Sequence, residues 1–234
     1  MSYGYIGGLP GVHTQLAAGY QSAVIQKPEF LVGGGIIDGT LTYAINNGTD
    51  NLVILAGTLM KQNAAGAFQP FIPAKTTASA LSSATTVTVG VAGAQAIYRA
   101  FGSTGAGTLT ALTTGSYVTV TVTAIDLVAG TLTCSALSAA LENGAPLLFG
   151  TVTASNAGGV LAFTGDSIGV WVSDFPNTIA NPGVGQATSW GAPVTGGFLG
   201  FNRIDNAPTT ASSIQAFKTL VQAMMPRMDI NQTF

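Results

Sequence analysis

Charged side chains are scarce in this sequence. Only 7% of the 234 residues are Asp, Glu, Lys or Arg, whereas 47% are hydrophobic and 31 are glycine. A soluble domain usually carries about 25% charged residues, which keep its surface hydrated and its copies apart. A chain with so few charges is therefore expected either to lie in a membrane or to present most of its surface to other protein molecules.

Long apolar runs are also missing, which argues against a membrane-spanning helix. Such a helix needs about 20 consecutive, mostly apolar residues, but the strongly apolar runs at 52–56 and 147–149 have the length of a strand. The sequence shows neither the aromatic girdles of an outer-membrane barrel nor an N-terminal basic and apolar export signal. We therefore expect no membrane contact and a soluble protein that buries its weakly charged surface in an assembly.

Histidine and cysteine occur once each, which limits the chemistry of the chain. A zinc site needs several such ligands, and a catalytic dyad needs partners that His13 does not have nearby in the sequence. Cys134 falls in a predicted strand and is expected to pack in the core. No internal disulfide can form, which suits assembly in a reducing cytoplasm. We predict no catalytic residue, no metal ligand and no cofactor.

Other patterns that resemble sites have simpler structural explanations. The Asn and Asp residues at 46–51 fit a tight turn better than a calcium loop, and the glycines at 33–35 lack the Lys-Ser/Thr of a phosphate loop. Trp171, near Asp166 and Asp174, is expected in the core or an interface, because a sugar cleft would show more interleaved aromatics. The seven Lys and Arg residues are scattered and the net charge is -2, so no nucleic-acid partner is expected.

The clearest structural pattern is strand alternation. Residues 85–89 and 117–123 alternate Val with Thr at the period of two of a half-buried strand. The second strand continues to Asp126, turns at 128–130 and returns over 131–134, which predicts a hairpin. Its buried face is expected to carry Val118, Val120 and Val122, with Thr119, Thr121 and Thr123 on the other face.

Further strands and one helix are predicted around this hairpin. Short β patterns lie at 36–37, 40–45, 52–55, 68–71, 147–153 and 168–172. Residues 135–141 are expected to form one or two helical turns. Apolar residues recur at spacings of three and four between a Ser-Ser cap and Pro226, which predicts an amphipathic helix over 212–225.

These elements predict a mainly β protein with a small β-barrel or β-sandwich core, an extended N-terminal arm and one C-terminal amphipathic helix. We expect an arm over 1–30, a β-rich core over 31–173 with room for two β subdomains, and a loop-rich segment over 174–234 that holds the helix. The arm has no hydrophobic face of its own. Its expected contacts with a partner are aromatic and apolar anchors: Tyr3, Tyr5, Leu9 and Tyr20.

Several segments resemble one family of virion proteins. The stretches Leu-Ala-Gly-Thr-Leu-Met at 55–60, Gly-Ala-Phe-Gln-Pro-Phe at 66–71, the hairpin at 118–134 and Gly-Ala-Pro-Leu-Leu at 144–148 are similar in style to the head decoration (cement) proteins of tailed bacteriophages. The similarity covers about residues 30–155. It implies a homotrimer at local threefold positions of an icosahedral head, with the N-terminal arm ordered on the major capsid protein.

The sequence is also compatible with other functions. The composition also suits a tail-tube, baseplate or head-fibre subunit of a virion, a minor capsid protein, or a sugar-binding β module for host attachment. An enzyme is the least favoured class, because the residues for a catalytic site are few. The expected location is the capsid surface of a virion assembled from protein made in the host cytoplasm.

Overall fold

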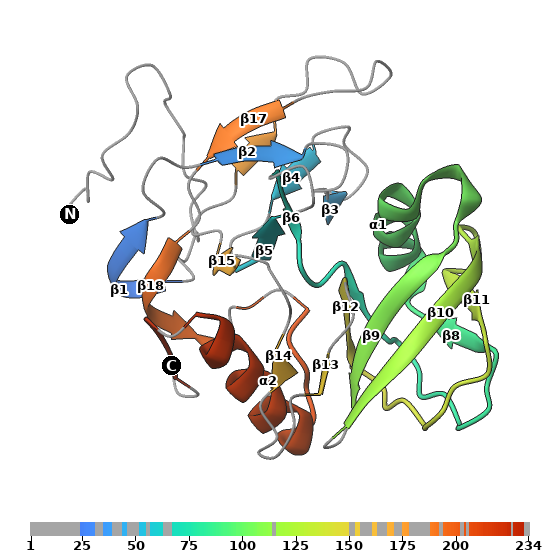
Figure 1. The fold of residues 1–234 in the computed structure, drawn as a ribbon. Coiled ribbons are helices and arrows are strands. Elements are labelled where there is room, and N and C mark those ends of the chain that lie inside the picture. The colour runs from blue at the N-terminus through green and yellow to red at the C-terminus, as the bar shows by residue number, and fades with distance from the viewer. Residues whose placement is uncertain are drawn as a thin grey trace.

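The protein is mainly β, as the sequence predicts, and its described residues include two α-helices, α1 and α2 (Figure 1). The residues that the computed structural model describes are 24–30, 35–38, 44–45, 52–54, 57–62, 67–113, 116–149, 153–154, 161–162, 168–170, 175–177, 188–191, 194–201, 204, 206–225 and 227–231. Within them, the strands form a large sheet, a curled six-stranded sheet and two small sheets.

The large sheet has eight strands. Their order is β1 (Val24–Phe30), β18 (Val194–Gly200), β15 (Ile168–Val170), β5 (Leu59–Gln62), β6 (Phe68–Pro70), β2 (Gly35–Asp38) and β17 (Thr188–Gly191), with β19 (Met228–Asn231) also beside β18. Only the β2–β6 and β18–β19 pairs are parallel. The sheet thus draws strands from all three segments expected from the sequence, and the division into those segments stays a prediction.

The two small sheets have two and three strands. One pairs β13 (Thr153–Ala154) with β14 (Leu161–Ala162), and the other orders β16 (Phe175–Asn177), β4 (Leu52–Ile54) and β3 (Ala44–Ile45). β16, β17 and β18 fall in the stretch that its Pro and Gly content marked as rich in loops. These strands have three to seven residues and lie among prolines and glycines, so the local sequence pattern did not predict them.

The six-stranded sheet is antiparallel throughout and curls into a half-barrel. Its strand order is β7 (Ala74–Lys75), β12 (Pro146–Phe149), β9 (Gly107–Thr113), β10 (Ser116–Asp126), β11 (Thr131–Cys134) and β8 (Thr86–Thr88). The chain enters it directly after β6, and the first strand, β7, pairs with the last, β12. Residues 74–149, called the half-barrel below, therefore start and finish side by side.

The predicted hairpin is confirmed as β10 and β11, with the predicted faces. Val118, Val120 and Val122 are at most 1% exposed, whereas the three threonines between and after them are exposed. In the turn, the Asp126 carboxylate accepts hydrogen bonds from the backbone N–H groups of Val128 and Ala129, each at 2.9 Å. The alternation of Val and Thr thus predicted correctly which face of the hairpin is buried and which is exposed.

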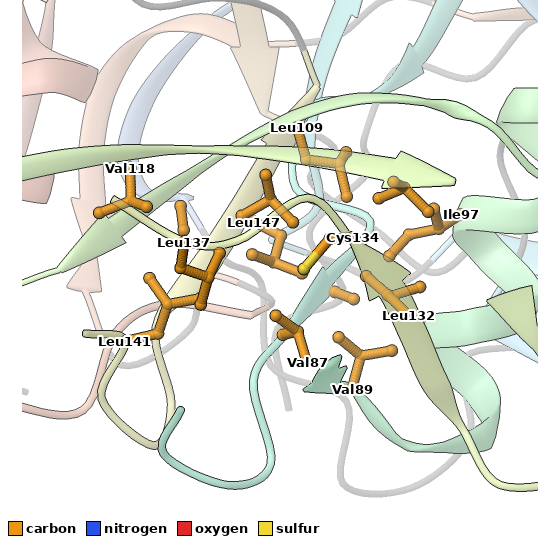
Figure 2. Close-up of a cluster of buried hydrophobic side chains, with 14 of the residues drawn as sticks. Val87, Val89, Ile97, Leu109, Val118, Leu132, Cys134, Leu137, Leu141 and Leu147 are labelled. Carbon is orange, nitrogen blue, oxygen red and sulfur yellow. The ribbon is translucent and has the colours of Figure 1, made fainter. Parts of the chain in front are cut away.

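One hydrophobic core, called the barrel core, fills the concave side of the half-barrel (Figure 2). Its members are Ala74, Val87, Val89, Ala94, Ile97, Leu109, Ala111, Val118, Val120, Val122, Leu132, Cys134, Leu137, Leu141, Leu147 and Phe149. Cys134 is 4% exposed and packs as a small apolar residue, which confirms the prediction for it.

A second core, called the joint core, lies where the half-barrel meets the large sheet. It contains Leu59, Phe71, Ile72, Leu112, Leu148, Leu199, Phe201, Ile204, Phe217, Leu220, Val221, Met225 and Ile230. β12 supplies both cores, because Leu147 faces the barrel core and the next residue, Leu148, faces the joint core. β9 and β12 thus form a wall that is buried on both faces.

The C-terminal helix is confirmed as α2 (Ala211–Met224). Phe217, Leu220 and Val221 are at most 2% exposed and pack in the joint core, as the apolar spacing predicts. Phe201 meets the Phe217 ring edge to face, with ring centroids 6.0 Å apart. In Figure 1, α2 runs between the β18 end of the large sheet and the half-barrel.

The expectation of a single helix was wrong. Residues Gly90–Phe101 form a second helix, α1, followed by a short 3₁₀ turn, η1 (Gly102–Thr104). Ala94 and Ile97 are fully buried in the barrel core, so one side of α1 covers the half-barrel. The helix starts with glycine and has no side-chain cap, and burial of Ala94 and Ile97 in the barrel core stabilises it.

The expectation of helical turns over 135–141 was also wrong. The spacing of Leu137 and Leu141 suits a helix, and both side chains are indeed buried. Their backbone groups instead form hydrogen bonds with the segment before β8. The N–H of Leu137 donates to the carbonyl oxygen of Ala84, and the backbones of Ala80 and Leu141 exchange two hydrogen bonds of 2.8 and 2.9 Å. Partners distant in sequence therefore override the local helical spacing.

Candidate partner-binding surface

The anchors predicted from the sequence, Tyr3, Tyr5, Leu9 and Tyr20, lie outside the described residues, as does His13. Among the described residues, the candidate surface lies on the half-barrel. Its convex side is covered by the large sheet and α2 along β9 and β12, through the joint core. The convex side of β10, β11 and β8 is the part open to a partner.

Threonines dominate this open surface. We call them the threonine face: Thr86 and Thr88 on β8, Thr131 and Thr133 on β11, Thr119, Thr121 and Thr123 on β10, and Thr108 on β9. All eight are exposed or partly exposed. The strand pairing places Thr131 opposite Thr88, Thr133 opposite Thr86, and Thr121 opposite Thr108.

Each of these side chains offers a hydroxyl and a methyl group and carries no charge. Branching at Cβ restricts the rotamers, so a contact costs little side-chain entropy. Thr123 Oγ1 donates to the Thr133 carbonyl at 3.3 Å, across the hairpin. The predicted Thr119, Thr121 and Thr123 thus form one row of the face. The Thr-x-Thr pattern at 86–88 and 131–133 is the sequence signal for the other rows.

Charge is nearly absent from the surface of the half-barrel. Residues 67–149 include only four charged side chains, Lys75, Arg99, Asp126 and Glu142, of which Asp126 alone is exposed. The hydrogen bonds from Ala129 and Val128 lower the pKa of the Asp126 carboxyl. This one exposed charge is therefore engaged by its own turn.

Three large apolar side chains are exposed on the same unit. Val128 at the tip of the hairpin is 91% exposed, Leu81 is 79% exposed, and Val91 at the start of α1 is 46% exposed. Val91 and Val128 lie at the same end of the half-barrel, because Gly130 touches the backbone of Gly90 and Val91. The surface therefore combines neutral hydroxyls with isolated apolar groups.

The described residues offer little for catalysis. Burial raises the pKa of the Cys134 thiol, which disfavours the reactive thiolate. In the part of the chain that the structure describes, no three His, Cys, Asp or Glu side chains gather as a metal site requires. Among the same residues, no helix has the length and apolar character needed to cross a membrane.

Comparisons of this chain with protein-family models, with curated proteins and with solved structures found no match.

Proposed function

We propose that this chain is a structural protein of a virion: a decoration protein that binds the outer surface of an icosahedral bacteriophage head as a homotrimer and stabilises it. It acts without a cofactor, and its partners are the major capsid protein and its own copies.

One observation carries the proposal. Both faces of β9 and β12 are buried in the half-barrel, and residues 67–113 and 116–149 carry only four charged side chains, of which one is exposed and three are partly exposed. A surface meant to remain in water usually carries about a quarter to a third of charged residues. A neutral surface of threonine with scattered Val and Leu suits a chain whose surface is covered in an assembly.

Binding to a shell would accumulate many modest contacts. A stable interface buries about 1,600 Å² in total, and its affinity depends on packing more than on charge pairs. A trimer would repeat each contact three times, so that weak individual contacts sum to firm attachment. A protein that bridges neighbouring capsid subunits in this way opposes their separation under internal pressure.

Two finer parts of the proposed function come from the sequence. In this proposal the curled sheet is the small β-barrel core expected of the family that the sequence resembles. The N-terminal arm, residues 1–30, is taken as the segment that orders on the major capsid protein through Tyr3, Tyr5, Leu9 and Tyr20. β1, which ends this segment, pairs with β18 and so ties the arm to the large sheet.

The direct test mixes the purified chain with phage heads assembled without it and measures co-sedimentation. Saturable binding to heads, with the free chain remaining a small oligomer, supports the proposal. Rings or polymers formed by the chain alone would indicate a tail-tube role instead. Binding to host surface polysaccharide but not to heads would indicate an attachment module.

A further inference from the structure

The N-terminus of α2 contacts a residue from the half-barrel. Thr210 occupies the cap position, but its side chain makes no capping hydrogen bond. Ser213, in the first turn, is fully buried, and its Oγ donates a hydrogen bond to Oε1 of Glu142. The two residues are 71 positions apart in the chain. A carboxylate from another unit thus lies where a helix has unpaired N–H groups and a positive end.

Glu142 is itself held in place by a buried threonine. Thr76 is 1% exposed, and its Oγ1 donates to the Glu142 carbonyl at 2.6 Å and accepts from Ala145 N–H at 2.9 Å. The Thr76 backbone adds two hydrogen bonds of 2.9 Å, accepting from Gly144 N–H and donating to the Ala145 carbonyl. The turn that presents Glu142 is therefore rigidly joined to the chain just beyond β7.

The same turn fits closely against the segment that leads into α2. Gly144 has φ of +83°, and a Cβ on it would lie 2.5 Å from Thr209 Oγ1. Slightly earlier, Asn206 Nδ2 donates to the Ile72 carbonyl at 3.2 Å. The segment just before Ser213 thus contacts both the turn that holds Glu142 and the chain just before the half-barrel.

The other end of this C-terminal segment belongs to the large sheet. After α2, β19 pairs in parallel with β18, with Leu199 opposite Ile230. Between the two ends, Phe217 and Leu220 fill the joint core against Leu112 and Leu148 of the half-barrel. Residues 206–225 and 227–231 therefore link the half-barrel to the large sheet.

We infer that residues 206–225 and 227–231 form a strap that fixes the half-barrel against the large sheet, and that Glu142 is the positioning residue that seats the strap by accepting a hydrogen bond from Ser213 in the first turn of α2. The hydrophobic side chains of α2 supply the attraction, whereas the Glu142–Ser213 contact sets where the helix begins. This inference concerns the internal architecture and holds whether or not the chain binds a phage head.

The test is hydrogen exchange of the full chain, read by mass spectrometry of its peptides. Glu142→Ala should speed the exchange of α2 and β19 about tenfold, the loss expected for one hydrogen bond to a charged group, and leave β10 and β11 protected as before. Ser213→Ala should give the same pattern. Asn143→Ala, an exposed neighbour in the same turn, is the matched control and should change neither region.

Two further variants test whether Glu142 and Ser213 act through the same contact. The double variant Glu142→Ala/Ser213→Ala should exchange no faster than either single variant, because both remove one contact. Glu142→Gln, which keeps an oxygen acceptor without the charge, should fall between wild type and Glu142→Ala. Unchanged exchange of α2 in Glu142→Ala, or equal acceleration of α2 and β10, would overturn the inference.

Discussion

Thr77 donates its backbone N–H to the carbonyl oxygen of Thr88 across 2.9 Å. Thr77 lies just beyond β7, and Thr88 ends β8, so this bond joins the two edges of the six-stranded sheet. The next residue, Val89, donates to the Gly130 carbonyl and ties the start of α1 to the hairpin turn. At this point the half-barrel offers no free sheet edge, the feature that otherwise invites uncontrolled strand pairing.

The hairpin register can be tested with a pair of neighbouring substitutions. Val120→Asp should unfold the half-barrel, because it places an unpaired carboxylate in the barrel core, where Val120 is 0% exposed. Thr121→Asp, on the exposed face, should cost within about 1 kcal/mol. Thermal unfolding followed by circular dichroism measures both. A larger loss for Thr121→Asp than for Val120→Asp would show that the register is displaced by one residue, which exchanges the two faces.

Gly130 tests the close approach of the hairpin turn to α1. It has φ of +67°, and a Cβ would lie 2.4 Å from the backbone carbon of Gly90. Gly130→Ala should therefore lower the free energy of unfolding by roughly 3 kcal/mol, from both strain and clash. Gly105→Ala is the control, because φ is +58° but the nearest atom lies 3.6 Å away; it should cost about 1 kcal/mol. Equal costs in denaturant unfolding would contradict this contact.

Tyr117 should make stability depend on alkaline pH. Burial raises the pKa of its phenol from 10.0 to about 12, so between these values the folded protein keeps a proton that the unfolded chain loses. The contribution is complete below pH 10 and is lost as the pH rises toward 12. Urea unfolding should show a steeper loss over this range for wild type than for Tyr117→Phe. Identical pH profiles would mean that the hydroxyl is not buried.

The free chain should be a trimer at micromolar concentration, because a surface with so little charge and so much apolar content needs partners. Light scattering coupled to size exclusion should give three times the chain mass of 23.5 kDa. A soluble monomer would count against the account of the neutral surface.

Deletion of residues 2–20 should separate attachment from folding. It removes Tyr3, Tyr5, Leu9 and Tyr20 but no described strand, so the thermal transition of the β core should stay within a few degrees of wild type. Co-sedimentation with phage heads should fall sharply. If the shortened chain binds heads as well as the full chain, the anchors lie elsewhere, and the threonine face becomes the next surface to vary.

Local patterns predicted the elements whose side chains alternate between core and solvent. The β10–β11 hairpin shows Val and Thr on opposite faces, and α2 shows its apolar stripe, so each carries its own signal. α1 does not, because it begins at Gly90 and includes Gly93, whose lack of a side chain allows close packing on Ala74. Its helical state depends on the barrel core that it covers.

The candidate surface was predictable only in part, for a similar reason. One row of the threonine face follows from the alternation in β10, but the neighbouring rows need the pairing of β8 with β11 and of β9 with β10. The Glu142–Ser213 contact has no local signal, since it joins residues 71 positions apart. Such contacts depend on how the half-barrel and α2 pack together, which a pattern within one segment does not contain.

Electron cryomicroscopy of phage heads with and without this chain tests the central claim most directly. The account predicts added density of three copies at local threefold positions on the outer surface, into which the large sheet and the half-barrel fit. It also predicts heads that withstand heating better when the chain is bound. Identical maps with and without the chain, or its density confined to the tail, would contradict the account.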